Sequence, residues 1–316
     1  MRYFIFDFNR DLKFIPSFLK SAAEAHHQPK KTKEWFLWKF RDNPFGATIL
    51  SCAEEDGEIV GCVAYGLQDF FFKNKVIKGA ISFETFLHPK FQKRGIFSKL
   101  IAIGEKETQK QGIKFLLNFP NLNSLKGFLN MGWNKIDISQ YWIKGRNLIT
   151  IPANVQSLRK NYKPNSPNWK DLISPNNFRQ TNKEFFEMCV TLKYLRWRFF
   201  NFPNGNYYWD SNDNYDLIGR YGQRGSLKEF QILYLNKKTS EFRYSKMLKN
   251  IKKELIFDLL GVCSTPNNLE KIKLIKNGFI KVPNRTNVCY KIIDESLIKK
   301  SDMNKLTLQG INYHTY

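Results

Sequence analysis

The sequence predicts an α/β (α+β) protein built of two similar halves, each a mixed, twisted sheet flanked by helices. Two observations carry this prediction. Strand and helix signals alternate along the first half, and short motifs recur in the same order in the second half. The composition is compatible, because 42% of the 316 residues are hydrophobic and 16% are aromatic, enough for two cores of ordinary size.

The first expected elements are a strand and two helices. An aromatic strand is expected near residues 2–8, followed by a helix around residues 10–25. Thr32 is placed to cap a second helix over residues 33–41, because a threonine side chain can accept a hydrogen bond from the first helical amides.

A hairpin is expected next. Asp56-Gly57 separates two apolar stretches, residues 48–54 and 58–66. This dipeptide tolerates the positive φ angles of a tight two-residue turn, so the two stretches should pair as antiparallel strands.

The elements that follow form a β-α-β unit. Residues 77–88 are a further strand, which Pro89 ends. Residues 98–111 are a helix stopped by Gly112, and residues 114–119 are the next strand. Strand, helix and strand in this order predict a parallel pair.

The internal repeat rests on two matches. Residues 38–46 match residues 197–205, with a tryptophan, a basic residue, a proline and a glycine at the same spacing. Residues 121–133 match residues 267–279: in each, an asparagine precedes a helix that closes on glycine and an aromatic residue. These matches favour an ancient duplication.

The segment richest in chemistry is a basic turn between the strand that ends at His88-Pro89 and the helix that follows. Backbone amides in such a bend can converge on an anion, helped by the helix dipole. Gly95 allows close approach of a ligand, and three cations add positive charge, so the turn is a candidate diphosphate cradle. It reads Gln92-Lys93-Arg94-Gly95-Ile96-Phe97-Ser98.

This segment resembles the GNAT superfamily of N-acetyltransferases, whose signature is a strand, a proline, then Q/R-x-x-G-x-G/A opening a helix. Gln92 and Gly95 fit, and Phe97 departs from the usual glycine or alanine. A second family element also fits, with an asparagine, a small residue, a general acid tyrosine and a glycine-aromatic pair. Here the equivalent positions are Asn121, Ser124, Phe128 and Gly132-Trp133, so a phenyl ring that cannot donate a proton replaces the tyrosine.

The resemblance implies roles for these residues. The turn from Gln92 to Ser98, together with Asn121, Ser124 and Phe128, would contact acyl-coenzyme A (acyl-CoA), the expected co-substrate. The Leu87 N–H would donate to the thioester carbonyl, and Glu84 or, less favourably, His88 would act as base. In an ideal strand Glu84 and Leu87 face opposite sides, and a bulge would change this. For both side chains a structural ion pair or hydrogen bond is the alternative.

The domain map follows from the resemblance and the repeat. Residues 1–150 would be a GNAT domain binding acyl-CoA, and residues 151–180 the connection. Residues 181–316 would be a degenerate GNAT-like domain forming part of the acceptor cleft, because no basic glycine loop is found there. Tyr207, Tyr208, Trp209 and Asp210 are its candidate cleft residues, whereas Trp38 and Trp197 are expected in the core.

Composition narrows the classes of function. The five cysteines lie far apart without a C-x-x-C pair and the histidines lack zinc spacing, so reduced, buried thiols and no metal are expected. No apolar run reaches the roughly 18 residues that could span a bilayer, and a cytoplasmic protein is expected. The net charge of +23 favours polyanionic partners, although the bias expected of a genome rich in A and T accounts for part of it.

Three functions remain open. The first is an acyl-CoA-dependent N-acyltransferase acting on the amine of a nucleotide-linked amino sugar, such as a dTDP-linked amino-dideoxyhexose used in polysaccharide biosynthesis, or on another small amine. The second is a tandem-GNAT aminoacyltransferase fed by tRNA, which the charge favours and the intact turn opposes. The third is a non-enzymatic sensor of acyl-CoA or a nucleic-acid binder. Acyl chain, acceptor and oligomeric state stay open.

Overall fold

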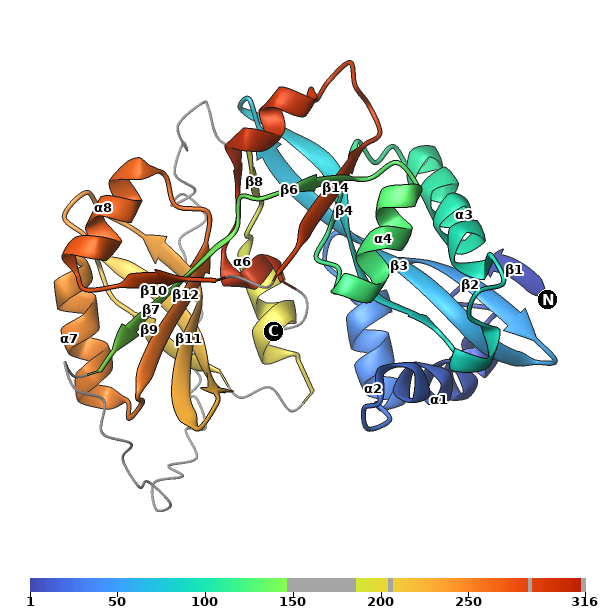
Figure 1. The fold of residues 1–316 in the computed structure, drawn as a ribbon, viewed down its shortest axis with the longest axis horizontal. Coiled ribbons are helices and arrows are strands. Elements are labelled where there is room, and N and C mark those ends of the chain that lie inside the picture. Colours follow the sequence, from blue (N-terminus) through green and yellow to red (C-terminus); the bar gives the residue numbers. More distant parts are fainter. Residues whose placement is uncertain (147–185, 204–206, 284–285, 314–316) are drawn as a thin grey trace. The chain divides into compact units, whose positions relative to one another are not determined.

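The computed structural model describes residues 1–146, 186–203, 207–283 and 286–313, which fall into two compact units. Each unit is assembled from segments that are distant in sequence (Figure 1). Unit 1 comprises Met1–Asp137, Asn182–Asn204 and Thr286–Lys305, and unit 2 comprises Ile138–Thr181, Gly205–Arg285 and Leu306–Tyr316. The expected connection over residues 151–180 lies outside the described residues.

Unit 1 contains a mixed sheet with helices on both faces. Its elements from the first two segments are β1 (Arg2–Ile5), η1 (Leu12–Phe14), α1 (Ile15–His26), α2 (Lys33–Phe36), η2 (Leu37–Arg41), β2 (Ile49–Glu55), β3 (Glu58–Phe72), β4 (Lys75–Leu87), η3 (Pro89–Phe91), α3 (Ile96–Lys110), β5 (Phe115–Asn118), α4 (Leu122–Asn130), β6 (Asn134–Ile136), β8 (Phe186–Met188), α6 (Leu192–Leu195) and η5 (Arg196–Phe200). The third segment adds β14 (Val288–Ile292) and η6 (Lys300–Lys305).

The sheet of unit 1 runs β1-β2-β3-β4-β5-β14-β6, and β8 also pairs with β3. One core lies between this sheet and the helices α1 and α2, and is rich in phenylalanine. A second core lies on the opposite face, under α3 and α4. Alternation along β3 separates them, since Cys62 and Ala64 belong to the first core and Val63 and Tyr65 to the second.

Unit 2 contains a second sheet, ordered β13-β7-β12-β11-β10-β9. Its elements are β7 (Gln140–Gly145), β9 (Tyr208–Ser211), β10 (Tyr215–Arg224), β11 (Leu227–Lys237), α7 (Tyr244–Glu254), β12 (Leu259–Ser264), α8 (Asn268–Lys276), β13 (Ile280–Val282), β15 (Leu306–Thr307) and η7 (Gly310–Asn312). The predicted fold class, with two mixed α/β sheets flanked by helices, is confirmed.

Each sheet contains a strand from the other half of the sequence that lies between two of its own strands. In unit 1, β14 is inserted between β5 and β6, antiparallel to both. In unit 2, β7 is inserted between β12 and β13, again antiparallel to both. Figure 1 shows β7, in green, among the yellow and orange strands of unit 2. The compact units therefore do not coincide with continuous halves of the chain.

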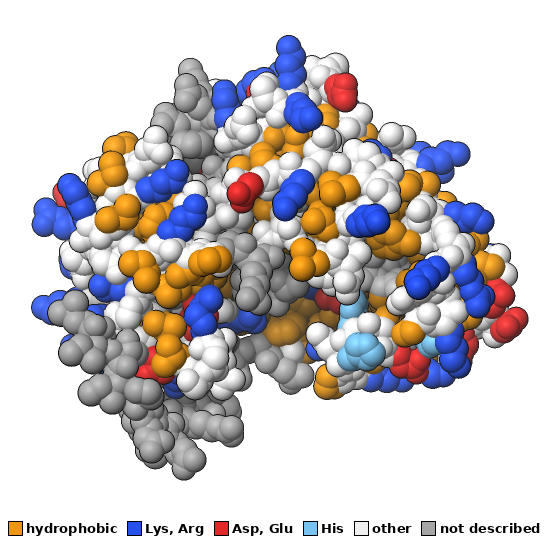
Figure 2. All heavy atoms as spheres, in the orientation of Figure 1, with side chains coloured by type: hydrophobic (Ala, Val, Ile, Leu, Met, Phe, Trp, Pro, Cys, Tyr) orange, Lys and Arg blue, Asp and Glu red, His pale blue; other side chains and the backbone are white. Residues whose placement is uncertain are grey.

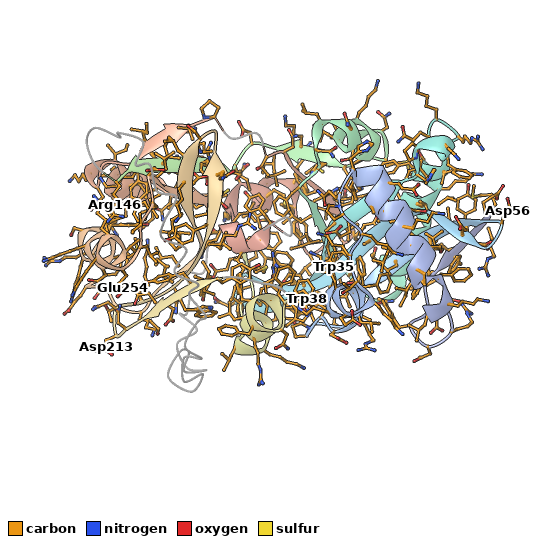
Figure 3. The ribbon with its side chains drawn as sticks, turned by 90° about the horizontal axis from the view of Figure 1, so that it is seen from below. Trp35, Trp38, Asp56, Arg146, Asp213 and Glu254 are labelled. Carbon is orange, nitrogen blue, oxygen red and sulfur yellow. The ribbon has the colours of Figure 1, made fainter. Side chains whose placement is uncertain are left out.

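Several local predictions are confirmed. Asp56 and Gly57 have φ angles of 53° and 82°, as the tight hairpin turn requires, and Figure 3 shows Asp56 at the tip of that hairpin. Thr32 Oγ1 accepts a hydrogen bond from the Trp35 N–H at 3.2 Å and so caps α2. The side chains of Asn121 and Asn267 cap α4 and α8 in the same way.

Two local predictions need correction. The helix expected over residues 33–41 is α-helical only to Phe36 and continues as the π-helical turn η2. Strand β3 extends to Phe72, beyond the expected residue 66, and turns back through Lys73 and Asn74, which both have positive φ. This second tight hairpin was missed because lysine is an uncommon residue at a positive φ.

Candidate functional site

The turn between β4 and α3 presents a row of backbone amides that have no hydrogen-bond partner in the part of the chain that the structure describes. Lys93 and Gly95 have φ angles of 62° and 72°, in the left-handed region, which bends the chain sharply before α3. Within the described residues, no hydrogen-bond acceptor faces the amides from Lys93 to Ser98; the next amide, that of Lys99, bonds to the Gly95 carbonyl at 3.3 Å. These donors point out of the helix start, as an anion cradle requires.

Space and charge at this turn also suit an anion. A Cβ atom added at Gly95 would meet nothing within 4 Å, so the turn is open at this point. Lys90, Lys93 and Arg94 are exposed, and the Arg94 guanidinium lies 5.2 Å from the centre of the Phe91 ring. Three exposed cations therefore lie in or next to the turn that carries these amides.

The departure at Phe97 has a packing explanation. A Cβ atom at Gly127 of α4 would come within 2.4 Å of the Phe97 ring, so the ring occupies the space over this glycine. Phe97 also makes an edge-to-face contact with Phe128, with ring centres 5.4 Å apart. Phe128 is buried and in turn packs against Trp133. The phenyl groups at both unusual positions thus pack together and fix α4 against the start of α3.

Strand β4 leaves its parallel neighbour just before the turn. It pairs with β5 only from Gly79 to Ser82. Towards its end β4 is paired with β3, where the His88 N–H donates to the Val60 carbonyl at 2.8 Å. In an antiparallel ladder, alternate residues point their amides to opposite sides. The Leu87 N–H is therefore directed away from β3, towards the edge that β5 has left.

Glu84 lies in a β-bulge on the same strand. The register of β3 and β4 shifts between Cys62 and Ala64, and Glu84 has a φ of 46°. A non-glycine residue in this region is strained by roughly 1–2 kcal/mol. The bulge changes the direction of the Glu84 side chain relative to a regular strand. Its carboxylate lies 3.8 Å from the Lys39 Nζ atom and is 30% exposed.

The carboxylate lines a depression of about 350 Å³, a space that includes open solvent. Apolar side chains of α1 form most of its wall, and Trp35, labelled in Figure 3, adds an aromatic side. Its polar members are Glu84, His26, Gln28 and Lys31. One carboxylate in an otherwise mainly apolar hollow suits the recognition of an amine.

His88 is engaged at both ring nitrogens. Its Nε2 lies 2.7 Å from a carboxylate oxygen of Glu24, and its Nδ1 accepts from the Lys90 N–H at 3.2 Å. The second bond fixes the tautomer, so Nε2 carries the proton and donates to Glu24. These contacts hold the end of β4 against α1 and start η3. They match the structural alternative for this residue.

The remaining predicted residues lie at the start of α4. Asn121 Oδ1 accepts from the Ser124 N–H at 2.9 Å and contacts the Ser124 hydroxyl at 3.1 Å. Both residues are thereby tied into the helix cap. The contact between Phe97 and Phe128 brings α4 and the turn together. That these two residues contact a cofactor stays a prediction.

Two paired tryptophans anchor unit 1, as expected for core residues. The Trp38 indole N–H donates to the Trp197 carbonyl at 2.7 Å, and the Trp197 indole donates to the Trp38 carbonyl at 2.8 Å. The rings are stacked with centres 5.3 Å apart. Each tryptophan lies on a π-helical turn, η2 or η5, so the repeated motif of the sequence is repeated in structure.

Sequence reasoning missed Lys39, the residue after Trp38. Its side chain is almost fully buried, and its ammonium faces Glu84 and lies 4.8 Å from the centre of the Phe83 ring. Burial lowers the pKa of Lys39 to about 8, while the nearby Glu84 carboxylate opposes this shift. The only signal in the sequence was its position in the repeat, where Arg198 matches it.

The aromatic residues proposed for the second half are engaged within unit 2. The Tyr208 hydroxyl donates to Glu254 at 2.5 Å, and the Tyr215 hydroxyl donates to Asp210. Burial raises the pKa of Asp210, and the Tyr215 hydroxyl opposes this. The segment between β11 and α7 contains no glycine, and α7 begins without a side-chain cap.

All five cysteines are buried free thiols, as predicted. Burial raises the pKa of Cys189 and of Cys289 to about 12, which keeps these thiols protonated and poorly nucleophilic. The described part of the chain holds no cluster of three or more candidate metal ligands. Among its helices, none combines the length and the apolar composition needed to cross a bilayer.

The strand, turn and helix of unit 1 lie within a stretch that matches a family of acyl-transferring enzymes. Residues 12–133 match the model of the acetyltransferase (GNAT) family, whose members use acyl-CoA as co-substrate. This match supports an acyl-transferring enzyme. A comparison with curated proteins gave no match.

Solved structures share the fold over nearly the whole chain. A probable N-acyltransferase from Enterococcus faecalis has a TM-score of 0.65 at 10% identity, covering 93% of this chain and 73% of the other. A GCN5-related N-acetyltransferase from Anabaena variabilis has a TM-score of 0.64 at 10% identity, with the same coverage. Eis1 from Mycobacterium abscessus has a TM-score of 0.60 at 12% identity, covering 93% and 74%. These likenesses concern the fold.

Proposed function

We propose that the protein transfers an acyl group from acyl-CoA to the amine of a nucleotide-linked amino-deoxy sugar. The observation that supports acyl-CoA is the row of unbonded amides from Lys93 to Ser98 at the start of α3. A diphosphate would satisfy these donors and would face the cations Lys90, Lys93 and Arg94. Gln92 would border the same turn.

Acyl transfer would take place where β4 and β5 separate. The Leu87 N–H would donate to the thioester carbonyl as negative charge develops on its oxygen. The amine nitrogen forms a bond to the carbonyl carbon, and the carbon–sulfur bond breaks. The thiolate that leaves takes a proton from solvent, because Phe128 has no proton to give.

Glu84 would accept the proton that the amine must lose. Its carboxylate lines the depression formed by α1 and α2, where a small amine could bind. His88 is a weaker candidate, since both of its nitrogens already have partners. A carboxylate can act directly or through one water molecule.

The choice of acceptor rests on charge and on a resemblance in sequence. A nucleotide-linked sugar carries phosphates, and the net charge of +23 would attract them. The Gly95-Ile96-Phe97-Ser98 turn resembles the turn of N-acyltransferases that modify such sugars in polysaccharide biosynthesis. The role of Tyr207 and Trp209 as cleft residues stays a prediction, and the enzyme would act in the cytoplasm.

Thiol release tests this proposal directly. The protein is mixed with acetyl-CoA or a longer acyl-CoA and a panel of amines, including dTDP-linked amino sugars, and free thiol is measured. We expect release that depends on a nucleotide-linked amino sugar and is weak with the free sugar. Binding of acyl-CoA without release for any amine would contradict the enzymatic proposal and favour a sensor.

Replacing Glu84 by glutamine tests the base. The Glu84→Gln variant should lower kcat at least tenfold and leave the affinity for acyl-CoA within twofold, because the amide keeps the shape of the side chain and loses its basicity. The matched control is Glu58→Gln, whose carboxylate is exposed on β3. Unchanged turnover in Glu84→Gln would remove this residue from the mechanism.

A tRNA-dependent aminoacyltransferase is the second candidate, and the charge of +23 favours it. Figure 2 shows lysine and arginine side chains spread over the visible face rather than gathered in one patch. A nucleic-acid groove usually concentrates its cations. Retention on immobilised tRNA without binding to immobilised coenzyme A would support this alternative.

A further inference from the structure

Lys39 carries a buried ammonium group that lies close to the Glu84 carboxylate within unit 1. Its side chain is 4% exposed, and its Nζ lies 3.8 Å from Glu84 Oε1. The rings of Phe83 and Trp38 lie 4.8 Å and 5.7 Å from the same atom and limit the positions it can take. Burying an ammonium is costly unless other interactions offset the lost hydration.

Both members of this pair lie on unusual backbone. Lys39 lies on the π-helical turn η2, and π-helical turns are frequent at functional sites. Glu84 has the positive φ of a bulge, which is strained for a residue with a side chain. Two uncommon backbone conformations thus bring one cation and one carboxylate together, at the wall of the depression that also holds His26 and Lys31.

We infer that Lys39 is a positioning residue for Glu84: its ammonium attracts the carboxylate and holds it in one orientation at the wall of the depression. This inference rests on the proposed function, in which Glu84 is the base. An exposed lysine could not do the same, because a mobile cation in water stabilises a carboxylate only weakly. Lys39 is fixed by packing and largely shielded from water.

The charged groups that act on Lys39 include two cations, Arg198 and Lys31, as well as the Glu84 carboxylate. The two cations repel the Lys39 ammonium, whereas Glu84 attracts it, so the ion pair offsets part of the cost of burying the ammonium. Removing Lys39 should therefore allow the Glu84 side chain to take other orientations.

The second copy of the motif supports a conservative variant. Arg198 takes the place of Lys39 on the matching turn η5, and it is 2% exposed. The same local structure therefore accommodates a buried guanidinium. Lys39→Arg keeps the positive charge, whereas Lys39→Met removes it and keeps a similar unbranched chain.

The experiment measures kcat and KM for the amine, and the affinity for acyl-CoA, in the full-length protein. Lys39→Met should lower kcat about tenfold at pH 7, because Glu84 spends less time in the orientation that accepts a proton. Affinity for acyl-CoA should stay within about twofold. Lys39→Arg should keep kcat within about threefold of that of the unmodified protein. The control Lys20→Met removes an exposed lysine that pairs with Glu58, and should leave kcat unchanged.

Two results would overturn the inference. One is an unchanged kcat in Lys39→Met; the other is an equal loss of kcat in Lys39→Arg, which would indicate disturbed packing instead of lost charge. If the unmodified protein acylates no amine, the proposed function fails, and denaturation then tests the pair by itself. Glu84→Gln should lower the denaturation midpoint when Lys39 is present and have little effect beside Lys39→Met. Equal effects in both backgrounds would show that the two residues are not coupled.

Discussion

Gly95 meets two requirements of the turn, a positive φ angle and open space in front of the amides. It has a φ of 72° and lies beside amides that have no acceptor among the described residues. A side chain here would be strained by its backbone, and it would also enter the open space in front of the amides. The absence of a side chain is therefore a condition for ligand access as well as for chain direction.

Gly95→Asp is expected to weaken acyl-CoA binding at least tenfold, because a carboxylate would repel the diphosphate. Gly112→Asp is a matched control: Gly112 has a φ of 74°, has equally open surroundings and lies beyond the opposite end of α3. Isothermal titration with acyl-CoA distinguishes the two. Similar losses in both variants would show that backbone strain, rather than charge at the turn, weakens binding.

Lys39 should give the protein a distinct dependence of stability on pH. Its pKa is about 8 in the folded protein, against the ordinary lysine value of 10.5 expected in the unfolded chain. Between these values the unfolded chain binds more protons, so the contribution of Lys39 to the unfolding free energy rises with pH. The slope approaches about 1.4 kcal/mol per pH unit at most.

Urea denaturation from pH 7 to pH 10.5 tests this. The difference in unfolding free energy between the unmodified protein and Lys39→Met should be constant below pH 8 and rise above it. The same difference for Lys20→Met should stay flat, because Lys20 is exposed. A flat difference for Lys39→Met would mean that its ammonium titrates as it does in water.

The sequence indicated which residues have reactive groups but not how burial changes them. Gln92, Gly95 and Glu84 could be selected from residue type and spacing. Lys39 could not, since its burial depends on Phe83 and Trp38, which are brought together only in the fold. The partners of His88 were equally hidden, because Glu24 lies on a different element.

At the scale of elements, α3 and α4 are joined by an unusual aromatic contact. Phe97 occupies the space above Gly127 and touches Phe128, so two departures from the family pattern compensate for each other in packing. A phenyl ring at position 97 requires a glycine at position 127. The start of α3, and with it the turn, is thereby held by α4.

Gly127→Ala should lower the melting temperature, although alanine favours a helix over glycine by about 1 kcal/mol. The added methyl group would come within 2.4 Å of the Phe97 ring, and overpacking costs about 1–3 kcal/mol. In a Phe97→Ala background the same substitution should raise the melting temperature, since the ring is gone. Calorimetry of the four proteins checks this. An effect of the same sign in both backgrounds would contradict the contact.

Elements with local signals were predicted well. The asparagine caps of α4 and α8 and the Asp56-Gly57 hairpin depend on neighbouring residues only. The π-helical turn η2 carries no such signal, because its apolar spacing is compatible with an α-helix. The hairpin at Lys73 and Asn74 depends on the pairing of long strands, which overrides the preference of lysine against positive φ.

At the scale of the whole molecule, the two sheets depend on strands that are distant in sequence. β14 completes the sheet of unit 1, and Lys291 on this strand pairs with Glu105 of α3 at 2.7 Å. The Trp133 indole N–H donates to the same carboxylate at 2.7 Å. The exchange of β7 and β14 between the two sheets could not be predicted from the sequence. Each of these strands follows an asparagine-capped helix, α4 or α8, so local signals are similar in the two halves.

A chain that ends at residue 150 should not fold into a stable domain. It lacks β14, so β5 and β6 lose the strand that pairs with both. We expect aggregation and no cooperative thermal transition. Fusing residues 286–305 to the shortened chain through a flexible linker should improve solubility, because it returns the missing strand. A cooperative transition for residues 1–150 alone would show that β14 is dispensable.

The exchanged strand also gives a structural reason to retain the C-terminal half. Loss of this half would remove β14 from the sheet that carries Glu84 and Leu87. Natural selection on the acyl transfer proposed for the N-terminal half would therefore preserve the C-terminal half as scaffolding. Its own surface is then free to diverge towards new ligands while the shared strand stays constrained.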